Sequence, residues 1–168
     1  MRPGRGTVPD SPVHVLVLTV STRAAAGQYV DRAGPAAVEI LRAAGHRVDD
    51  PVVVADGVGV TEALLRGVAQ AYDVVVTCGG TGLAPDDRTP EMTRGMVDRE
   101  VPGLAEALRA DGVARGVPTA SLSRGVAGVA GGTLVVNLPG SVGGARDGAS
   151  LLAPLLRHAV DQMAGGDH

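Results

Sequence analysis

Lysine is absent from this chain, and aromatic residues are almost absent. The 168 residues include 15 basic side chains, all of them Arg, together with two Tyr, no Phe and no Trp. Without Lys, both a Walker-type phosphate loop and a Schiff-base mechanism are excluded. So few rings offer no stacking platform for bases, and a net charge of −3 disfavours nucleic-acid binding. We therefore expect no nucleic-acid partner and a core built from aliphatic side chains.

Cysteine and long apolar runs are scarce as well. The single Cys78 permits neither an intramolecular disulfide nor a Cys-rich zinc site, and we interpret it as a small core residue. No apolar run reaches the roughly 18 residues of a membrane span. Residues 1–12 are rich in Pro, Gly and Arg and lack the apolar stretch of a signal peptide. The sequence predicts a cytoplasmic protein without membrane contact, with a flexible tail over 1–12 and a single domain over 13–165.

Apolar runs of strand length alternate with helical patterns along the chain. This order predicts an α/β fold with a mostly parallel central sheet, its crossovers right-handed. We expect Leu64, Leu65 and Val68 to form the buried face of one helix, and Leu151, Leu152, Leu155, Leu156 and Val160 that of the last. For residues 112–132 the composition predicts irregular structure or a small hairpin. Strands are expected at 13–19, 46–55, 74–76 and 133–138, and helices at 37–44, 60–71, 89–99, 104–110 and 142–164.

The most informative stretch runs from Asp73 to Glu91. Residues 74–76 are three consecutive Val, as in a central strand buried on both faces. Residues 79–82, Gly-Gly-Thr-Gly, give a backbone whose successive N–H groups can point at an anion. Two acids follow, and then Thr89-Pro90, which indicates an N-cap and the first helical position. This arrangement favours a site for phosphate and a divalent metal, whereas a glycine turn with a capping acid is the alternative interpretation.

Polar residues follow the end of each predicted strand. In a parallel sheet these ends share one edge, so residues 21–23, Asp56, 79–87 and 137–141 are expected to lie together. Two carboxylates with phosphate nearby suit Mg²⁺, which takes few protein ligands and completes its shell with phosphate oxygens and water. The chemistry that this pattern favours is phosphoryl or nucleotidyl transfer.

Several ordered motifs carry a resemblance. GGTG with its acid and TPE (79–91), PGLAEALR (102–109), LSRGVAG (122–128) and NLPGS (137–141) together resemble the MogA/MoaB family of molybdenum-cofactor biosynthesis. The similarity extends over residues 13–165, and the stretch STRAAAGQYVDRAGP is similar to the MogA branch.

The resemblance implies a molybdopterin adenylyltransferase with a three-layer α/β fold. Mg²⁺ and ATP would be bound, and the terminal phosphate of molybdopterin would attack the α-phosphorus of ATP, releasing pyrophosphate. It also implies a homotrimer and a handover of product to a molybdate-inserting protein. By position, Asp56 and Asp87 match the metal-binding and catalytic pair. The nucleotide and pterin pocket would be formed by Ser21, Arg23, Gly79, Gly80, Thr81, Gly82, Ser123, Pro139, Gly140 and Ser141.

The chain departs from the family pattern at one position, and two other functions are possible for the sequence. Many relatives carry Arg where this chain has Asp86, which makes Asp86 a candidate further metal ligand. A molybdopterin-binding or handover module without turnover is the second hypothesis, although a pure binder of an anion gains nothing from two acids unless a metal lies between them. A dinucleotide-dependent dehydrogenase is disfavoured, because no G-x-G-x-x-G follows the first strand. Composition leaves open whether 112–132 is a lid or a trimer contact.

Overall fold

The computed structural model describes residues 11–166, so residues 1–10 of the expected tail lie outside the described part. Its strands are β1 (His14–Val20), β2 (Arg47–Val48), β3 (Val52–Val54), β4 (Val74–Cys78), β5 (Arg99–Glu100), β6 (Ala127–Ala130) and β7 (Thr133–Leu138). Its α-helices are α1 (Thr22–Ala25), α2 (Ala33–Ala43), α3 (Val58–Ala69), α4 (Thr89–Arg94), α5 (Pro102–Ala114) and α6 (Val142–Met163), and η1 (Pro118–Leu122) is a 3₁₀ helix. None of the helices in this range has the length and apolarity needed to cross a bilayer.

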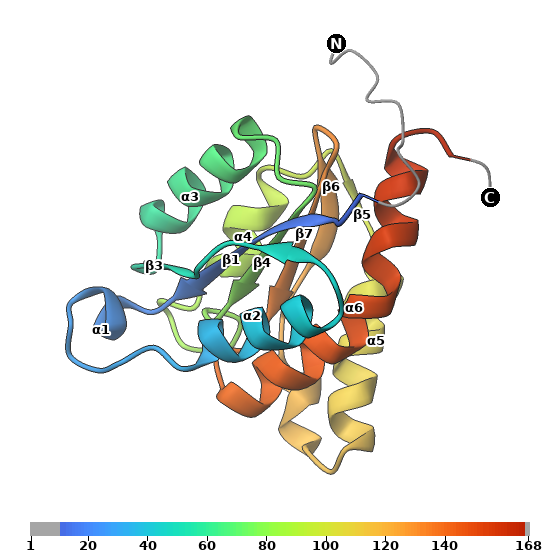
Figure 1. Ribbon diagram of the computed structural model, residues 1–168. Coiled ribbons are helices and arrows are strands. Elements are labelled where there is room, and N and C mark those ends of the chain that lie inside the picture. Colours follow the sequence, from blue (N-terminus) through green and yellow to red (C-terminus); the bar gives the residue numbers. More distant parts are fainter. Residues whose placement is uncertain (1–10, 167–168) are drawn as a thin grey trace.

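All strands belong to one sheet in the order β2-β1-β4-β7-β6-β5, with β3 also paired to β1 (Figure 1). The pairs that β1 makes with β2, β3 and β4 are parallel, as is the pair β4–β7. Only β6 and β5 run antiparallel to their neighbours. The expectation of a mostly parallel central sheet is confirmed.

The two central strands of the sheet are buried. Every residue of β4 and β7 is buried, as the unbroken Val run predicted for a central strand. Cys78 ends β4 fully buried, and this burial, with the nearby charge of Asp31, raises the pKa of its thiol to about 12. The thiol is therefore protonated and unreactive at neutral pH, in agreement with its interpretation as a core residue.

Helices cover both faces of the sheet, giving three layers (Figure 1). Alternate residues of β1 point to opposite faces, so Val15 and Val17 pack with α2, α5 and α6, and Leu16 and Leu18 with α3 and α4. Val, Leu and Ala supply almost all of this packing. The three-layer architecture implied by the resemblance is confirmed.

Three predicted elements were wrong in extent. The strand expected over 46–55 is two short strands, because residues 49–51 leave the ladder with β1 and Pro51 has no N–H to donate to it. The helix expected over 89–99 ends at Arg94, since Gly95 follows as its C-cap and residues 99–100 pair with β6 instead. The helix expected over 104–110 is longer and runs from Pro102 to Ala114.

Two predicted core positions were also wrong. Leu65 is 54% exposed and Leu155 is 46% exposed, whereas Leu64, Leu152 and Leu156 are fully buried. The buried stripe of each helix is narrower than an unbroken Leu-Leu pair suggests. Residues 112–132, for which irregular structure or a small hairpin was expected, hold the end of α5, η1 and β6. The hairpin there is formed by β6 with β7, a strand beyond this range, and Gly131 and Gly132, which both have positive φ, join the two.

Candidate functional site

The loops that follow the parallel strands meet at one edge of the sheet. The N–H of Ser21, after β1, donates to the Val54 carbonyl of β3 at 2.9 Å, and the N–H of Gly79, after β4, donates to the Leu138 carbonyl of β7 at 3.0 Å. Gly79 itself sits so close to β1 that a Cβ there would lie 2.3 Å from the Val20 carbonyl oxygen. The convergence expected from parallel strand ends is therefore present.

The glycine loop of residues 79–82 presents its amides and hides its carbonyls. The carbonyl of Gly80 accepts from the Thr89 N–H at 3.1 Å, that of Thr81 from the Arg124 N–H at 2.9 Å, and that of Gly82 from the Arg124 side chain at 2.8 Å. The N–H groups of Gly80, Thr81 and Gly82 donate to no acceptor within residues 11–166. Three successive unpaired amides form a place for a phosphate group.

The two acids Asp56 and Asp87 both contact this loop. Asp56 Oδ2 accepts from the N–H of Thr22 at 3.1 Å and from its hydroxyl at 2.7 Å, while Oδ1 lies 3.1 Å from where a Cβ on Gly80 would be. Asp87 Oδ2 accepts from the Ala84 N–H at 3.1 Å and lies 2.6 Å from the corresponding position on Gly82. The carboxylates thus flank two glycines that are separated by one residue.

The donor set around the loop suits a hard cation that brings its own ligands. Across the described residues no three acidic, His or Cys side chains gather as a metal site, so Asp86, which is exposed, does not complete one with Asp56 and Asp87. Oδ1 of each of the two flanking acids accepts no hydrogen bond from the described chain. Two carboxylate oxygens, with phosphate and water, match the coordination that Mg²⁺ takes in proteins.

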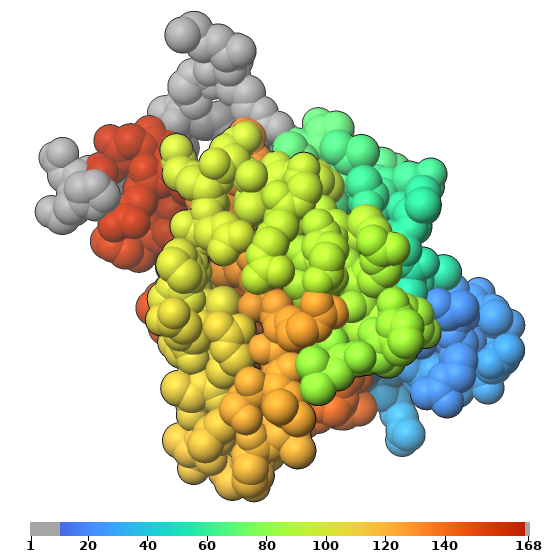
Figure 2. Space-filling model, turned by 180° about the vertical axis from the view of Figure 1, so that it is seen from behind, coloured from blue at the N-terminus to red at the C-terminus, as the bar shows by residue number. Residues whose placement is uncertain are grey.

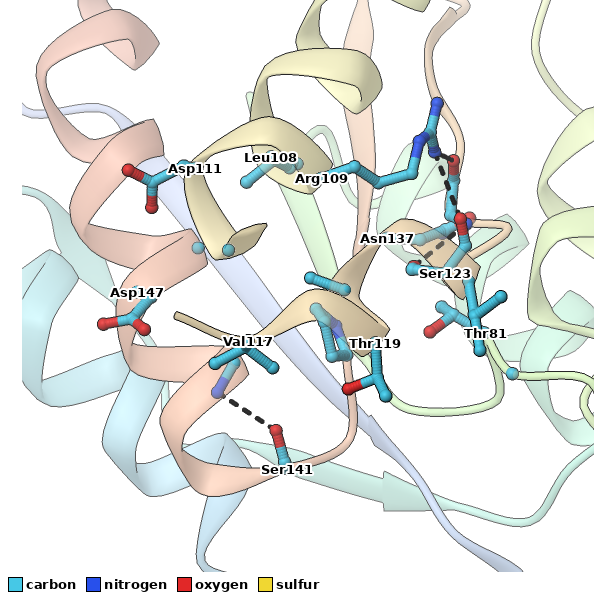
Figure 3. A pocket seen from close by; sticks show the side chains of 18 of the residues that line it. Thr81, Leu108, Arg109, Asp111, Val117, Thr119, Ser123, Asn137, Ser141 and Asp147 are labelled. Carbon is cyan, nitrogen blue, oxygen red and sulfur yellow. Dashed lines mark hydrogen bonds between the residues drawn. The ribbon is translucent and has the colours of Figure 1, made fainter. Parts of the chain in front are cut away.

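A pocket of about 660 Å³ opens beside the glycine loop. Its walls come from residues 81–83, helix α5, the η1 segment, the end of β7 and the start of α6 (Figure 3). In Figure 2 the bright green segment that follows β4 lies between the orange part of the chain and the blue segment of α1. The volume is in the range of small-molecule sites, and most of the lining is apolar, including Leu83, Leu108, Val117 and Leu122.

One end of the pocket is the N-terminus of the 22-residue helix α6. Ser141 is its N-cap and accepts from the Gly144 N–H at 3.1 Å, as the dashed line in Figure 3 shows. The N–H groups of Val142 and Gly143 have no partner inside the helix. The helix dipole and these amides favour an anion, so the pocket offers a second phosphate position near the glycine loop.

The polar side chains of the pocket lie on two sides. Asp111 and Asp147 lie on the side formed by α5 and α6, bridged by Arg115 at 2.7 and 3.8 Å (Figure 3). On the other side Arg109 donates to the Gly125 carbonyl at 3.0 Å. Asn137 is 3% exposed and its amide donates to the hydroxyls of Thr77 at 3.0 Å and Thr93 at 2.9 Å.

The structure divides the predicted site residues into three groups. Thr81, Gly82, Ser123, Pro139 and Ser141 line the pocket. Others lie at the sheet edge without lining it: Gly79, Gly80, Gly140, Asp56 and Asp87.

Ser21 and Arg23 form the third group, on the α1 side of the edge. Ser21 caps α1 and accepts from the Tyr29 hydroxyl at 3.1 Å, and the Arg23 guanidinium lies 5.5 Å above the Tyr29 ring. These two residues therefore do not line the pocket, although Ser21 adjoins Thr22, the partner of Asp56.

Sequence reasoning missed most of the outer pocket wall. Leu108, Arg109 and Asp111 belong to a helix whose facing was not predicted, and the η1 segment fell in the stretch without a readable pattern. Asn137, a polar residue near the end of a mostly apolar strand, had already been predicted at the sheet edge with residues 137–141.

Comparisons with known proteins agree with this geometry. Residues 16–158 match the family model described as a probable molybdopterin binding domain. The chain is 36% identical over 160 residues to a molybdopterin adenylyltransferase of Helicobacter pylori, covering 91% of this chain and 89% of that one. A solved structure of the molybdopterin biosynthesis Mog protein from Mycobacterium ulcerans superposes with a TM-score of 0.83 at 48% identity, covering 91% of this chain and 99% of that one.

One relative is much longer than this chain. A molybdenum cofactor biosynthesis bifunctional protein of Synechococcus elongatus is 38% identical over 157 residues, which is 93% of this chain. The chain spans about half, 49%, of that protein.

Proposed function

Because the chain belongs to the molybdopterin-binding domain family, within its MogA/MoaB group, we propose that it is a molybdopterin adenylyltransferase of molybdenum-cofactor biosynthesis. Its substrates are molybdopterin and ATP, and its products are adenylylated molybdopterin and pyrophosphate. One observation carries the proposal: a loop with three unpaired amides, flanked by two acids, opens onto a ligand-sized pocket that ends at a helix N-terminus.

The chemistry of the walls supports a position for each of the two substrates. The apolar pocket suits the pterin, whose terminal phosphate would lie near the start of α6. The triphosphate would lie along the amides of Gly80, Thr81 and Gly82, with the nucleoside toward Ser21 and Arg23. Gly140 packs against Gly79, where a Cβ would lie 3.1 Å from the Gly79 Cα, so the two anion positions adjoin.

Asp56 and Asp87 would hold Mg²⁺, which supplies charge neutralisation at the phosphates when bound. The residues of the chain orient the two phosphates so that a pterin phosphate oxygen approaches the α-phosphorus in line. That oxygen forms the new bond to phosphorus as the bond to the β-phosphate oxygen breaks, and pyrophosphate leaves with the bonding electron pair. The loop amides stabilise the charge that develops on the equatorial oxygens.

The proposal is tested by pyrophosphate release from purified protein given molybdopterin, ATP and Mg²⁺. We expect Asp87→Ala to lower the rate by at least about a hundredfold, as for loss of a preorganised electrostatic group. Asp50→Ala, at an exposed carboxylate paired with Arg42, is the control and keeps the wild-type rate. An Asp87→Ala variant with wild-type turnover would remove this acid from the mechanism.

Asp86 is tested in the same assay. Its exposed position supports a minor role, so Asp86→Ala is expected to lower turnover by less than about tenfold. A loss equal to that of Asp87→Ala would instead make it the further metal ligand that its place in the sequence suggested.

A molybdopterin-binding or handover protein without turnover is the second candidate function. The apolar rim of the pocket, where Leu83 is 68% and Leu122 is 54% exposed, supports an encounter with another protein at its mouth. Binding of molybdopterin without any ATP-dependent product would favour this candidate.

The remaining proposals concern the setting of the reaction. We propose a homotrimer, which native mass spectrometry checks directly, and handover of the product to a molybdate-inserting protein. Use of ATP supports a cytoplasmic reaction.

A further inference from the structure

One arginine holds the loop that carries Asp87. Resting on the function proposed above, we propose that Arg124 is the positioning residue of the site: it fixes the Asp87 loop and ties it to the wall of the pocket. Neither acid-to-acid spacing nor the glycine motif points to this residue, and the comparisons assign it no role.

Arg124 contacts the loop at both ends. Its backbone N–H donates to the Thr81 carbonyl at 2.9 Å, and its side-chain Nε donates to the Gly82 carbonyl at 2.8 Å. Nη2 donates to the carbonyl of Asp87 itself, and Nη1 pairs with Glu91 on α4. One planar guanidinium thus joins the start of the loop, its acid and the helix that follows, which a Lys ammonium has no geometry to do.

The hydrogen-bond donors of the Arg124 guanidinium are used by acceptors within the protein. All three of its nitrogens have acceptors, and its charge is balanced by Glu91, whose carboxyl pKa is lowered chiefly by the hydrogen bond from Arg124. Its side chain is only 33% exposed. Arg124 therefore acts on the loop and is not a spare cation for substrate phosphate.

Few other contacts hold the loop in place. Asp87 makes a tight turn with Ala84, through its own N–H at 3.0 Å and its carboxylate at 3.1 Å, and residues 83–86 are exposed. These contacts are local to the loop. Among residues 11–166, the hydrogen bonds that join the segment from Thr81 to Asp87 to other parts of the chain come from Arg124.

The same arginine belongs to the pocket wall by its place in the chain. Its neighbours Ser123 and Gly125 line the pocket, and their carbonyls accept from Arg109 at 3.4 and 3.0 Å. Figure 3 shows Arg109 reaching toward Ser123 across this wall. A ligand that shifts residues 123–125 therefore shifts the group that holds Asp87.

The first test is steady-state kinetics of two substitutions. Arg124→Met keeps much of the side-chain volume and removes the guanidinium. We expect kcat to fall about ten- to a hundredfold with little change in KM for ATP, because Asp87 is misplaced while the N–H groups of the glycine loop remain. Arg124→Lys keeps the charge and should give an intermediate loss.

Two controls distinguish the loss of the guanidinium hydrogen bonds from the loss of the ion pair and from a change in the stability of α4. Glu91→Gln removes the ion pair but leaves both carbonyl contacts, so kcat should stay within about threefold of wild type. Arg94→Met removes the arginine at the end of α4, whose exposed pair with Glu100 at 3.3 Å lies outside the loop, and turnover should be unchanged. Wild-type kcat in Arg124→Met, or an equal loss in Arg94→Met, would overturn the proposal.

A double-mutant cycle asks whether Arg124 acts through Asp87. If it does, Arg124→Met in an Asp87→Ala background causes no further loss of rate, because the group that it positions is already gone. A loss that multiplies would show an independent effect of Arg124 and contradict the proposal.

Amide exchange supplies a readout that does not depend on activity. In Arg124→Met the N–H groups of Asp87 and Thr89 should exchange faster, while those of β4 and β7 keep their protection. If the wild-type protein proves inactive, the proposed function fails and this measurement still decides the role of Arg124. Unchanged exchange at Asp87 and Thr89 would refute the positioning role even in an active enzyme.

Discussion

At Gly80 three parts of the site come into contact. Its φ of +65° lies in the region that favours glycine, and a Cβ there would lie 2.2 Å from Thr89 Oγ1 and 3.1 Å from Asp56 Oδ1. The loop can expose its N–H groups because Gly80 has no side chain, so its backbone can approach both α4 and Asp56 closely. This one position explains why the motif needs glycine beyond its turn.

The hydroxyl next to Gly80 is an exception among buried groups. In the described part of the chain, Thr89 Oγ1 is the buried side-chain oxygen or nitrogen that lacks a hydrogen-bond partner. One turn later on α4, Thr93 donates to the Thr89 carbonyl at 2.9 Å and accepts from Asn137. Two threonines of equal burial thus differ in whether their hydroxyls are satisfied.

That difference gives a matched pair of substitutions. Thr89→Val removes an unpaired oxygen, so we expect the free energy of unfolding to stay the same or rise. Thr93→Val leaves the Asn137 amide short of an acceptor and should lower it by about 1–3 kcal/mol. Denaturant unfolding of both variants measures this, and a larger loss in Thr89→Val would show that its hydroxyl has a partner in solution.

Some of these residues could be predicted from sequence and some could not. Gly79–Gly82 and the acid Asp87 lie within one short motif, so their meeting is a local property of the chain. Thr89 was predicted as the N-cap but is the first helical residue, with Arg88 at the cap position. Arg124 lies 37 residues beyond Asp87, and no local pattern shows which carbonyls a distant guanidinium will reach.

At the scale of elements, α6 shows how packing narrows an apolar helix face. Leu152 and Leu156 are fully buried against the sheet, while Leu155, predicted to be buried with them, is 46% exposed. Adjacent Leu residues on a helix are separated by about 100°, so one of each pair faces away. Composition alone does not choose which one.

The difference in burial between Leu152 and Leu155 predicts that truncating each to Ala lowers the free energy of unfolding by different amounts. Leu152→Ala should lower the free energy of unfolding by about 2–5 kcal/mol, since it leaves a cavity between α6 and the sheet. Leu155→Ala should cost less than about 1 kcal/mol. Similar costs in thermal or denaturant unfolding would mean that α6 is rotated relative to this structure, or that an assembly contact buries Leu155.

A cluster of three polar side chains lies at the start of β1, the end of the strand that is far from the glycine loop. Asp49, just after β2, accepts from the Tyr72 hydroxyl at 2.5 Å and lies 3.1 Å from His14 Nε2. The rings of His14 and Tyr72 are 4.3 Å apart. The Tyr72 hydrogen bond, followed by the His14 contacts and the Arg47 charge, outweighs desolvation and lowers the pKa of Asp49 below its ordinary value.

The sign of this pKa shift sets a pH dependence. A carboxyl whose pKa is lower in the folded state stabilises that state above its unfolded pKa of about 3.9, and the stabilisation is lost as pH falls through the folded value. Asp49→Asn should therefore flatten part of the decline in unfolding midpoint as the pH falls through the unfolded pKa of the Asp carboxyl and below it. An unchanged acid decline in the variant would assign it to other carboxyls.

Other elements were misjudged for reasons of pairing. β2 and β3 were predicted as one strand over 46–55, centred on Val52–Val54, yet two acids and Pro51 separate Val48 from Val52 and each strand pairs separately with β1. Arg99 was assigned to the end of a helix, but it pairs with Val129 of β6, 30 residues further along the chain. Such pairings depend on the finished sheet.

At the scale of the whole molecule, the parallel sheet is what makes the site. The predicted convergence of strand ends is confirmed, because it follows from topology and needs no knowledge of side-chain packing. The pocket required more: α5 and η1 had to fold back beside the glycine loop, and that placement is visible only in three dimensions. Sequence therefore indicated the anion-binding edge better than the cavity beside it.

The central claim is that this edge joins an adenylyl group to a pterin phosphate, and radiolabelled ATP tests it most directly. With ATP labelled at the α-phosphate, we predict that the label moves to molybdopterin in a Mg²⁺-dependent reaction, and that label at the γ-phosphate is released as pyrophosphate. Transfer of the γ-label to the pterin, or no transfer of either label, would contradict the account.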